Sequence, residues 1–296
     1  MDTSKLYGTG VAMVTPFTED YQIDYESLEK LLERIIEGGV NYLVVMGTTG
    51  EASTLSPKEK QAILEFVVEK NAGRLPIVYG IGGNSTMDVV ERLEQQSYAG
   101  IDAILSVAPY YNKPSQAGYI HHYEKVADAS KRPVIMYNVP GRTAGNMKAS
   151  TTIELSRHPN IIAMKEASGD LVQCMKIATA TTDQFVLISG DDMLTVPMIS
   201  CGARGVISVV ANLLPYQFSK TVDLALQGKF SEAMNIQYDL LEVNDFLFEE
   251  GNPAGLKSAL KHLGIMGDTL RPPLLPVSEG LEKVISRWAE KSLIPR

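Results

Sequence analysis

The sequence has few of the residues that build disulfide or metal sites. Its two cysteines, Cys174 and Cys201, lie far apart in apolar surroundings. They predict buried thiols in a reducing compartment, without a disulfide framework. Its four histidines form no HExxH-type pair and have no cysteine partners at zinc spacing. We therefore expect no metal site.

Long apolar runs and basic tracts are also missing. No apolar stretch approaches the roughly 18 residues that a membrane helix needs. The first ten residues, MDTSKLYGTG, contain no apolar core of the kind found in signal peptides. The formal net charge is -8 and no basic tract is present, which argues against a nucleic-acid partner. These absences predict a cytoplasmic protein that binds neither membrane nor nucleic acid.

The sequence does contain a regular series of short apolar runs. Its 296 residues, 45% of them hydrophobic, are enough for two average domains or one large α/β barrel. The runs are rich in Val, Ile and Leu, as in parallel strands buried on both faces. The predicted strands are Gly10–Pro16, Tyr42–Gly47, Pro76–Gly82, Asp102–Pro109, Pro133–Pro140, Asn160–Glu166, Phe185–Gly190 and Gly205–Val210.

Amphipathic helical patterns lie between these runs. Asp24–Ile36 carries apolar residues at helical spacing. Ser56 and Glu59 form a capping-box pattern, with Pro57 at the first helical position. The other predicted helix N-caps are Ser85 or Thr86, Ser115, and Asp191 or Asp192.

Alternation of strands and helices predicts a (β/α)8 TIM barrel over residues 1–228. After Gly228 the strand pattern stops, and Phe230–Glu249, Pro253–Leu263 and Ser278–Ser292 are predicted helices. Residues 229–296 are therefore expected to form a C-terminal helical domain. A doubly wound sheet is the main alternative. The missing Gly-x-Gly-x-x-Gly turn after the first strand disfavours its dinucleotide-binding form.

A lysine stands at the end of one apolar strand, in the stretch IIAMKEASGD. Because side chains alternate along a strand, Lys165 is expected to face the barrel interior and to converge with Tyr137 on the preceding strand. Burial lowers the pKa of a lysine, and a neutral amine can attack a carbonyl to form a Schiff base. A tyrosine hydroxyl can then shuttle the protons. The alternative is an ion pair with Glu166 or with another acid at the barrel rim, although the Glu166 side chain should point the other way.

Other polar groups follow the strand ends. Thr48 and Thr49, in the Gly47–Glu51 turn, can donate hydrogen bonds to a carboxylate, or can simply cap local backbone groups. Arg142 can grip a substrate carboxylate from its loop or remain a solvated charge. Tyr110 and Tyr111 fit either a core or a subunit contact.

Five motifs occur in one order: GTTGE (Gly47–Glu51), PYYN (Pro109–Asn112), YNVPGRT (Tyr137–Thr143), IIAMKEASG (Ile161–Gly169) and GVISVVAN (Gly205–Asn212). In this respect the chain resembles, nearly end to end, the dihydrodipicolinate synthase family, which groups with other pyruvate-dependent barrel aldolases such as N-acetylneuraminate lyase. GTTGE and the arginine of YNVPGRT favour the synthases. The resemblance implies a lyase that condenses pyruvate with L-aspartate 4-semialdehyde on the way to diaminopimelate and lysine. It also implies a homotetramer, built as a dimer of dimers, that needs no cofactor or metal.

The resemblance implies a role for each matching residue. Lys165 would form the Schiff base and Tyr137 would donate and accept protons. The other implied roles belong to Thr48, Thr49 and Tyr111 (proton relay), Tyr110 (interdigitation at the dimer interface), Thr48 and Thr49 (pyruvate carboxylate), Arg142 (aldehyde carboxylate), and Ile207 and Gly190 (pyruvate pocket).

One departure from the family pattern concerns regulation. Lysine-inhibited members carry histidines on the helix after GTTGE, where Pro57 and Lys60 stand here. Ala52 replaces a small hydroxyl residue and Asp88 a longer acid, whereas Asn84 and Tyr110 match. A positive Lys60 should repel a lysine effector, so we expect weak or absent feedback inhibition.

Two rival functions remain. A class I aldolase that cleaves a 2-keto-3-deoxy sugar acid would use the same chemistry and release pyruvate. A binding module for keto acids would be favoured by loss of the lysine or the tyrosine, and both are present.

Overall fold

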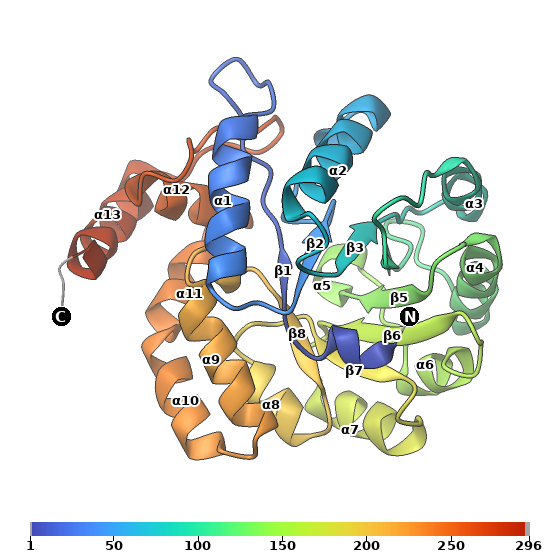
Figure 1. The fold of residues 1–296 in the computed structure, drawn as a ribbon. Helices are drawn as coiled ribbons and strands as arrows, with labels where there is room; N and C mark the ends of the chain where they lie inside the picture. The colour runs from blue at the N-terminus through green and yellow to red at the C-terminus, as the bar shows by residue number, and fades with distance from the viewer. Residues whose placement is uncertain (1, 294–296) are drawn as a thin grey trace.

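In the computed structural model, which describes residues 2–293, eight parallel strands close into a barrel in chain order (Figure 1). This confirms the predicted TIM barrel. The strands are β1 (Gly8–Ala12), β2 (Tyr42–Val45), β3 (Ile77–Gly80), β4 (Ala103–Val107), β5 (Val134–Asn138), β6 (Ile161–Glu166), β7 (Val186–Ser189) and β8 (Gly205–Ser208).

The barrel closes between its first and last strands, where β1 pairs with β8 in the register Gly8↔Gly205. A Cβ atom on Gly205 would lie 2.1 Å from the carbonyl oxygen of Gly8. Gly8 itself has a φ of 86°, in the left-handed region that favours glycine. The two glycines therefore allow the close approach of the backbones that closure requires.

Helices cover the outside of the barrel, and local sequence signals begin several of them. The capping box at Ser56 is present, and Ser85 and Ser115 cap their helices as predicted. Leu194, and not Asp191 or Asp192 as predicted, is the N-cap of the helix after β7, although Asp191 Oδ1 accepts hydrogen bonds from Met193 N and Leu194 N just ahead of that helix. The barrel helices are α1 (Tyr25–Glu37), α2 (Pro57–Asn71), α3 (Thr86–Gln95), α4 (Gln116–Ala129), α5 (Pro140–Thr143), α6 (Ala149–Leu155), α7 (Leu171–Ala180), α8 (Thr195–Ser200) and α9 (Pro215–Leu226).

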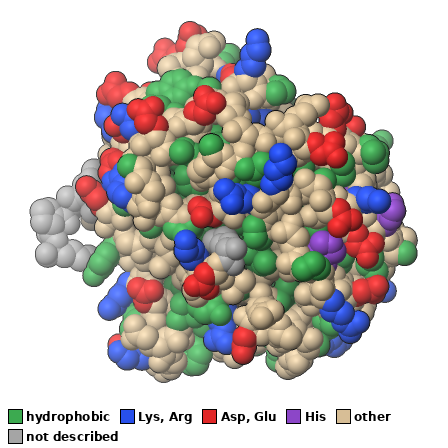
Figure 2. Space-filling view, turned by 45° about the vertical axis from the view of Figure 1, so that its right-hand side comes forward, with side chains coloured by type: hydrophobic (Ala, Val, Ile, Leu, Met, Phe, Trp, Pro, Cys, Tyr) green, Lys and Arg blue, Asp and Glu red, His purple; other side chains and the backbone are tan. Residues whose placement is uncertain are grey.

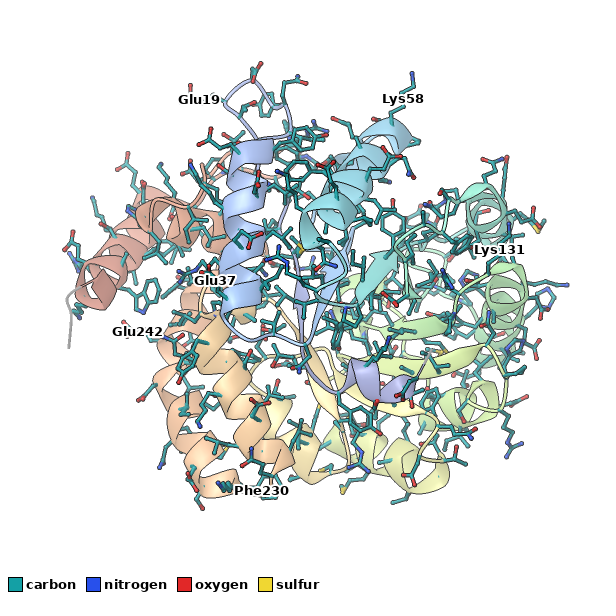
Figure 3. All side chains as sticks on the ribbon, in the orientation of Figure 1. Glu19, Glu37, Lys58, Lys131, Phe230 and Glu242 are labelled. Atoms are coloured by element: carbon teal, nitrogen blue, oxygen red, sulfur yellow. The ribbon has the colours of Figure 1, made fainter. Side chains whose placement is uncertain are left out.

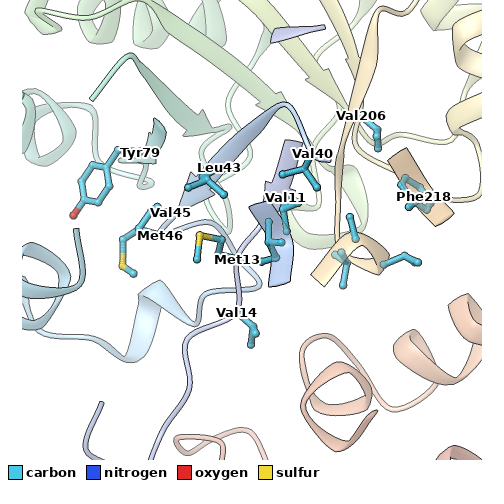
Figure 4. Packing of buried hydrophobic residues seen from close by; sticks show 14 of the residues in the cluster. Val11, Met13, Val14, Val40, Leu43, Val45, Met46, Tyr79, Val206 and Phe218 are labelled. Carbon is cyan, nitrogen blue, oxygen red and sulfur yellow. The ribbon is translucent and has the colours of Figure 1, made fainter. Parts of the chain in front are cut away.

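Alternation along the strands divides the core into two layers. On β2, Leu43 and Val45 face outward into the layer between strands and helices, part of which Figure 4 shows. Tyr42 and Val44 face inward and join the cluster that fills the barrel. Residues of α9 such as Phe218 complete the outer layer. Both faces of each strand are buried, so successive residues along a strand are apolar. This accounts for the near-continuous apolar runs in the sequence.

Four helices follow the barrel: α10 (Phe230–Asp239), α11 (Leu241–Phe248), α12 (Ala254–His262) and α13 (Glu279–Leu293). They lie together on one side of the molecule, in orange and red in Figure 1. The predicted single helix Phe230–Glu249 is divided at Leu240, which caps both α10 and α11. Helix α12 contacts α11 and α13. The proposed boundary near residue 228 falls just after α9 and remains a prediction.

The surface carries mixed charge. Acidic and basic side chains are interspersed on the face in Figure 2, and labelled side chains such as Glu19 and Lys58 point outward in Figure 3. Within residues 2–293, no helix combines the length and apolarity needed to cross a membrane. Cys174 is buried as predicted, whereas Cys201 is partly exposed, and both thiols are free.

Candidate active site

Lys165 is the penultimate residue of β6 and lies inside the mouth of the barrel, where only 6% of the residue is exposed. It is paired in register with Tyr137 on β5. The Lys165 Nζ atom lies 4.3 Å from the centre of the Tyr137 ring. The two side chains therefore converge as predicted. They do so because residues paired in register on neighbouring strands point to the same face of the sheet, here the barrel interior.

The surroundings of Lys165 favour an uncharged amine. Burial lowers its pKa to about 8; the negative charge of Asp192 opposes this shift and the positive charge of Arg142 adds to it. At pH 7 roughly one amine in ten is then neutral, against about one in a few thousand for an ordinary lysine. The side chain is thereby prepared to act as a nucleophile.

Glu166 is not the partner of Lys165. Its carboxylate accepts hydrogen bonds from Asn138 Nδ2 at 3.0 and 3.1 Å, from Ser168 N at 2.7 Å and from Gln173 Nε2 at 3.0 Å. These donors lie on the outer side of the barrel wall, as expected for neighbouring residues on a strand. Glu166 therefore does not form the ion pair that was the alternative explanation for Lys165.

Tyr137 is buried and is hydrogen-bonded to the side chain of Thr48. Burial raises the pKa of its phenol, while the Arg142 charge and the Thr48 hydrogen bond lower it. The phenol is therefore protonated at neutral pH and has a polar neighbour through which a proton can pass. This arrangement places a proton donor beside the amine.

Within the turn Gly47–Glu51, the adjacent residues Thr48 and Thr49 have different surroundings. The turn is closed by hydrogen bonds from Gly50 N to Gly47 O and from Glu51 N to Thr48 O, both 3.1 Å long. Thr48 is exposed and contacts Tyr137. Thr49 is buried, and its Oγ1 accepts a hydrogen bond from Asn252 Nδ2. Of the two threonines in the predicted proton relay, Thr48 contacts Tyr137, whereas Thr49 contacts Asn252.

Arg142 lies on α5, a single helical turn that begins at Pro140, where the sequence predicted a loop. Its side chain is exposed, yet its charge acts on both Tyr137 and Lys165. Among residues 2–293 its guanidinium has no ion-pair partner. It is therefore free to bind an acidic group at the barrel mouth.

Gly190 and Ile207 adjoin the amine. A Cβ atom on Gly190 would lie 3.1 Å from Lys165 Cε, so glycine leaves room for the lysine stem. Ile207 lies on β8 and belongs to the cluster inside the barrel. By contrast, Tyr111 has a φ of 75° and is 87% exposed, so the single chain directs it to the surface and does not join it to Tyr137.

Comparison with known proteins decides the family. The model of the dihydrodipicolinate synthetase family matches residues 5–291. The chain belongs to the dihydrodipicolinate synthetase family. The 4-hydroxy-tetrahydrodipicolinate synthase of Flavobacterium psychrophilum is 50% identical over 285 residues, which are 96% of this chain and 97% of that protein.

Solved structures of the dihydrodipicolinate synthetase family share the whole fold. The chloride-inhibited dihydrodipicolinate synthase of Acinetobacter baumannii, complexed with pyruvate, has a TM-score of 0.93 at 38% identity and covers 96% of this chain and 98% of its own. The enzyme of Cyanidioschyzon merolae with lysine bound has a TM-score of 0.92 at 36% identity, covering 97% and 98%.

Two polar residues at this family site escaped the sequence reasoning. The Asp192 carboxylate is buried, and its Oδ2 accepts hydrogen bonds from Val209 N at 3.0 Å and Val210 N at 3.3 Å. Burial raises the pKa of this carboxyl to about 6. Asp192 follows the end of β7 by three residues, a position that the sequence pattern assigned to a helix cap. Asn252 is the second such residue, and no motif pointed to it.

Proposed function

We propose that Lys165 forms an imine with pyruvate and that the resulting enamine attacks L-aspartate 4-semialdehyde. The chain is a lyase of the 4-hydroxy-tetrahydrodipicolinate synthase type, the activity named for its relatives. The pyruvate complex of the Acinetobacter baumannii enzyme supports the first substrate. The observation that carries the proposal is the buried Lys165 amine beside the Tyr137 phenol.

The reaction begins when the neutral Lys165 amine adds to the keto carbon of pyruvate. Tyr137 donates a proton to the carbonyl oxygen, which leaves as water as the imine forms. The protonated imine withdraws electrons, so a methyl proton is lost and an enamine results. The enamine carbon then bonds to the aldehyde carbon, whose oxygen takes a proton. Hydrolysis or cyclisation of the product frees the lysine.

The remaining side chains recognise charge and move protons. Thr48 and Thr49 bind the pyruvate carboxylate, while Gly190 and Ile207 line its pocket. Arg142 binds the carboxylate of the aldehyde. Thr48 continues the proton path from Tyr137, and Tyr111 completes it. The high exposure of Tyr111 in the single chain supports a homotetramer in which this region lies at a subunit contact.

The proposal is tested by adding pyruvate and borohydride, which reduces an imine to a stable amine. We expect the mass increase to map to Lys165. A coupled assay with L-aspartate 4-semialdehyde then identifies the acceptor. Cleavage of a 2-keto-3-deoxy sugar acid to pyruvate, with little condensation, would favour the sugar-acid aldolase instead. Absence of any trapped adduct would contradict both aldolase functions.

Imine formation should depend strongly on pH. The lowered pKa of Lys165, about 8, means that the reactive neutral amine increases as pH rises through this value. We expect the rate of borohydride-trapped adduct formation to increase from about pH 6, reach half its maximum near pH 8 and level off by about pH 10. Mass spectrometry of samples quenched at short times measures it. A rate that still rises steeply at the upper end would show that burial does not activate this amine.

Removal of the Arg142 side chain should weaken binding of the aldehyde. We expect Arg142→Ala to raise KM for L-aspartate 4-semialdehyde by about 10- to 100-fold, because a charge-assisted contact is lost. Imine formation with pyruvate should persist. Arg132→Ala, at another exposed arginine, serves as the control. Unchanged KM for the aldehyde would remove Arg142 from the substrate-binding residues.

Feedback inhibition by lysine should be weak or absent. Lys60 lies on α2, and both burial and the nearby Arg92 charge lower its pKa. Two cations therefore stand close together where a cationic effector would bind. We expect the purified enzyme to keep its activity in millimolar lysine, measured in the coupled assay. Strong inhibition at that concentration would refute the prediction.

A further inference from the structure

The C-terminal helical segment reaches the threonine turn through Asn252. This residue lies between α11 and α12, and its Nδ2 donates a hydrogen bond of 2.9 Å to Thr49 Oγ1, 203 positions away in the sequence. Both residues are buried, with 9% of Asn252 and 2% of Thr49 exposed. A side chain outside the barrel therefore contacts one of the two threonines that we propose bind the pyruvate carboxylate.

Further contacts hold the turn and this segment in fixed positions. Lys257, which is fully buried on α12, lies 2.5 Å from Glu51 Oε1 and donates to Thr269 O at 2.8 Å. The backbone N–H of Arg271 donates to Glu51 Oε2 at 3.2 Å. The end of the turn is thus tied to the C-terminal segment from two sides. The contact between Asn252 and Thr49 is enforced by this surrounding structure.

The chemistry of the contact fixes the direction of the Thr49 hydroxyl. A hydroxyl has one proton to donate, whereas an amide nitrogen of asparagine can only donate. Thr49 must therefore accept from Asn252, and its own proton remains for another acceptor. Among residues 2–293, the Thr49 hydroxyl donates no hydrogen bond of its own. A hydroxyl that accepts a hydrogen bond is also polarised toward donating a stronger one.

We propose that Asn252 is a positioning residue that keeps Thr49 a hydrogen-bond donor to the carboxylate of the keto acid. This inference rests on the proposed function, since it requires pyruvate at the barrel mouth. It makes the C-terminal segment part of substrate recognition. Thr48, which contacts Tyr137, retains the proton-transfer role.

The decisive variant is Asn252→Asp, which keeps the size of the side chain and reverses the hydrogen bond. A carboxylate there accepts the Thr49 proton and turns it away from the substrate. We expect KM for pyruvate to rise by at least about 10-fold, with a smaller change in kcat and an unchanged KM for the aldehyde. Asn252→Ala, which only frees the hydroxyl, should raise it less.

A matched control is Asn71→Asp. Asn71 is also buried, hydrogen-bonds the backbone of Leu75 and lies at the end of α2. This variant should lower thermal stability without changing KM for pyruvate. A purely structural role for Asn252 would make the two aspartate variants behave alike, with reduced stability and no selective effect on pyruvate.

Two further measurements complete the test. If Asn252 acts through Thr49, the double variant Asn252→Ala/Thr49→Val should have the same KM for pyruvate as Thr49→Val alone. This measurement remains possible even if Asn252→Asp does not fold. At saturating pyruvate, borohydride should still label Lys165 in every Asn252 variant. Wild-type KM in folded Asn252→Asp, or additive effects in the double variant, would overturn the inference. Failure to label Lys165 in the unmodified enzyme would instead refute the proposed function.

Discussion

Lys165→Arg is expected to form no borohydride-trapped adduct with pyruvate and to lower kcat/KM by at least about 100-fold. Arginine preserves the positive charge and much of the length of the side chain, but its guanidinium stays protonated and is not a nucleophile. The loss would therefore report the missing amine and not the missing charge. Trapping followed by mass spectrometry, together with the coupled assay, measures both effects.

The control for this variant is Lys125→Arg, at an exposed position on α4. It should leave both adduct formation and turnover unchanged. A Lys165→Arg enzyme that condensed the two substrates at the native rate would rule out covalent catalysis at this position, whatever the structural resemblance.

The second large effect concerns stability. Lys257→Met is expected to lower the free energy of unfolding by about 3–5 kcal/mol, because it leaves the buried Glu51 carboxylate without its cation. Burial lowers the pKa of Lys257 to about 8, with Glu51 opposing that shift, so the Lys257 amine is mostly charged at pH 7. Urea unfolding of the purified protein measures the loss.

Two further variants distinguish loss of the Lys257–Glu51 ion pair from non-specific destabilisation of the fold. Lys30→Met removes the cation of an exposed ion pair with Glu26 on α1, and it should have no measurable effect. The double variant Glu51→Gln/Lys257→Met removes both buried charges and should be more stable than Lys257→Met alone. If Lys257→Met unfolds at the same urea concentration as Lys30→Met, the buried pair does not stabilise the fold.

The barrel and the reactive pair could be predicted from local pattern. Near-continuous apolar runs alternating with amphipathic helices allow few architectures, and the capping signals at Ser56, Ser85 and Ser115 are read from neighbouring residues. Lys165 and Tyr137 could be placed together because both lie near the ends of adjacent parallel strands, with the same parity. Pattern alone left their chemistry open, and the five motifs favoured the Schiff-base interpretation.

Other features could not be read from the sequence, because they depend on distant contacts. Asp192 resembles a helix cap by position, yet its Oδ2 atom accepts hydrogen bonds from backbone N–H groups after β8. The adjacent residues Thr48 and Thr49 look equivalent in GTTGE, yet one contacts Tyr137 and the other Asn252. The break at Leu240 carries no glycine or proline to mark it.

The sequence by itself determined the closed eight-stranded barrel, the inward position of Lys165 beside Tyr137 and the family, since each depends on periodicity or on residues close together in the chain. Only the tertiary structure decided what holds the threonine turn. Asn252, Lys257 and Arg271 come from the last 50 or so residues. Local sequence patterns do not predict their contacts, because these form only when the C-terminal segment packs against the Gly47–Glu51 turn.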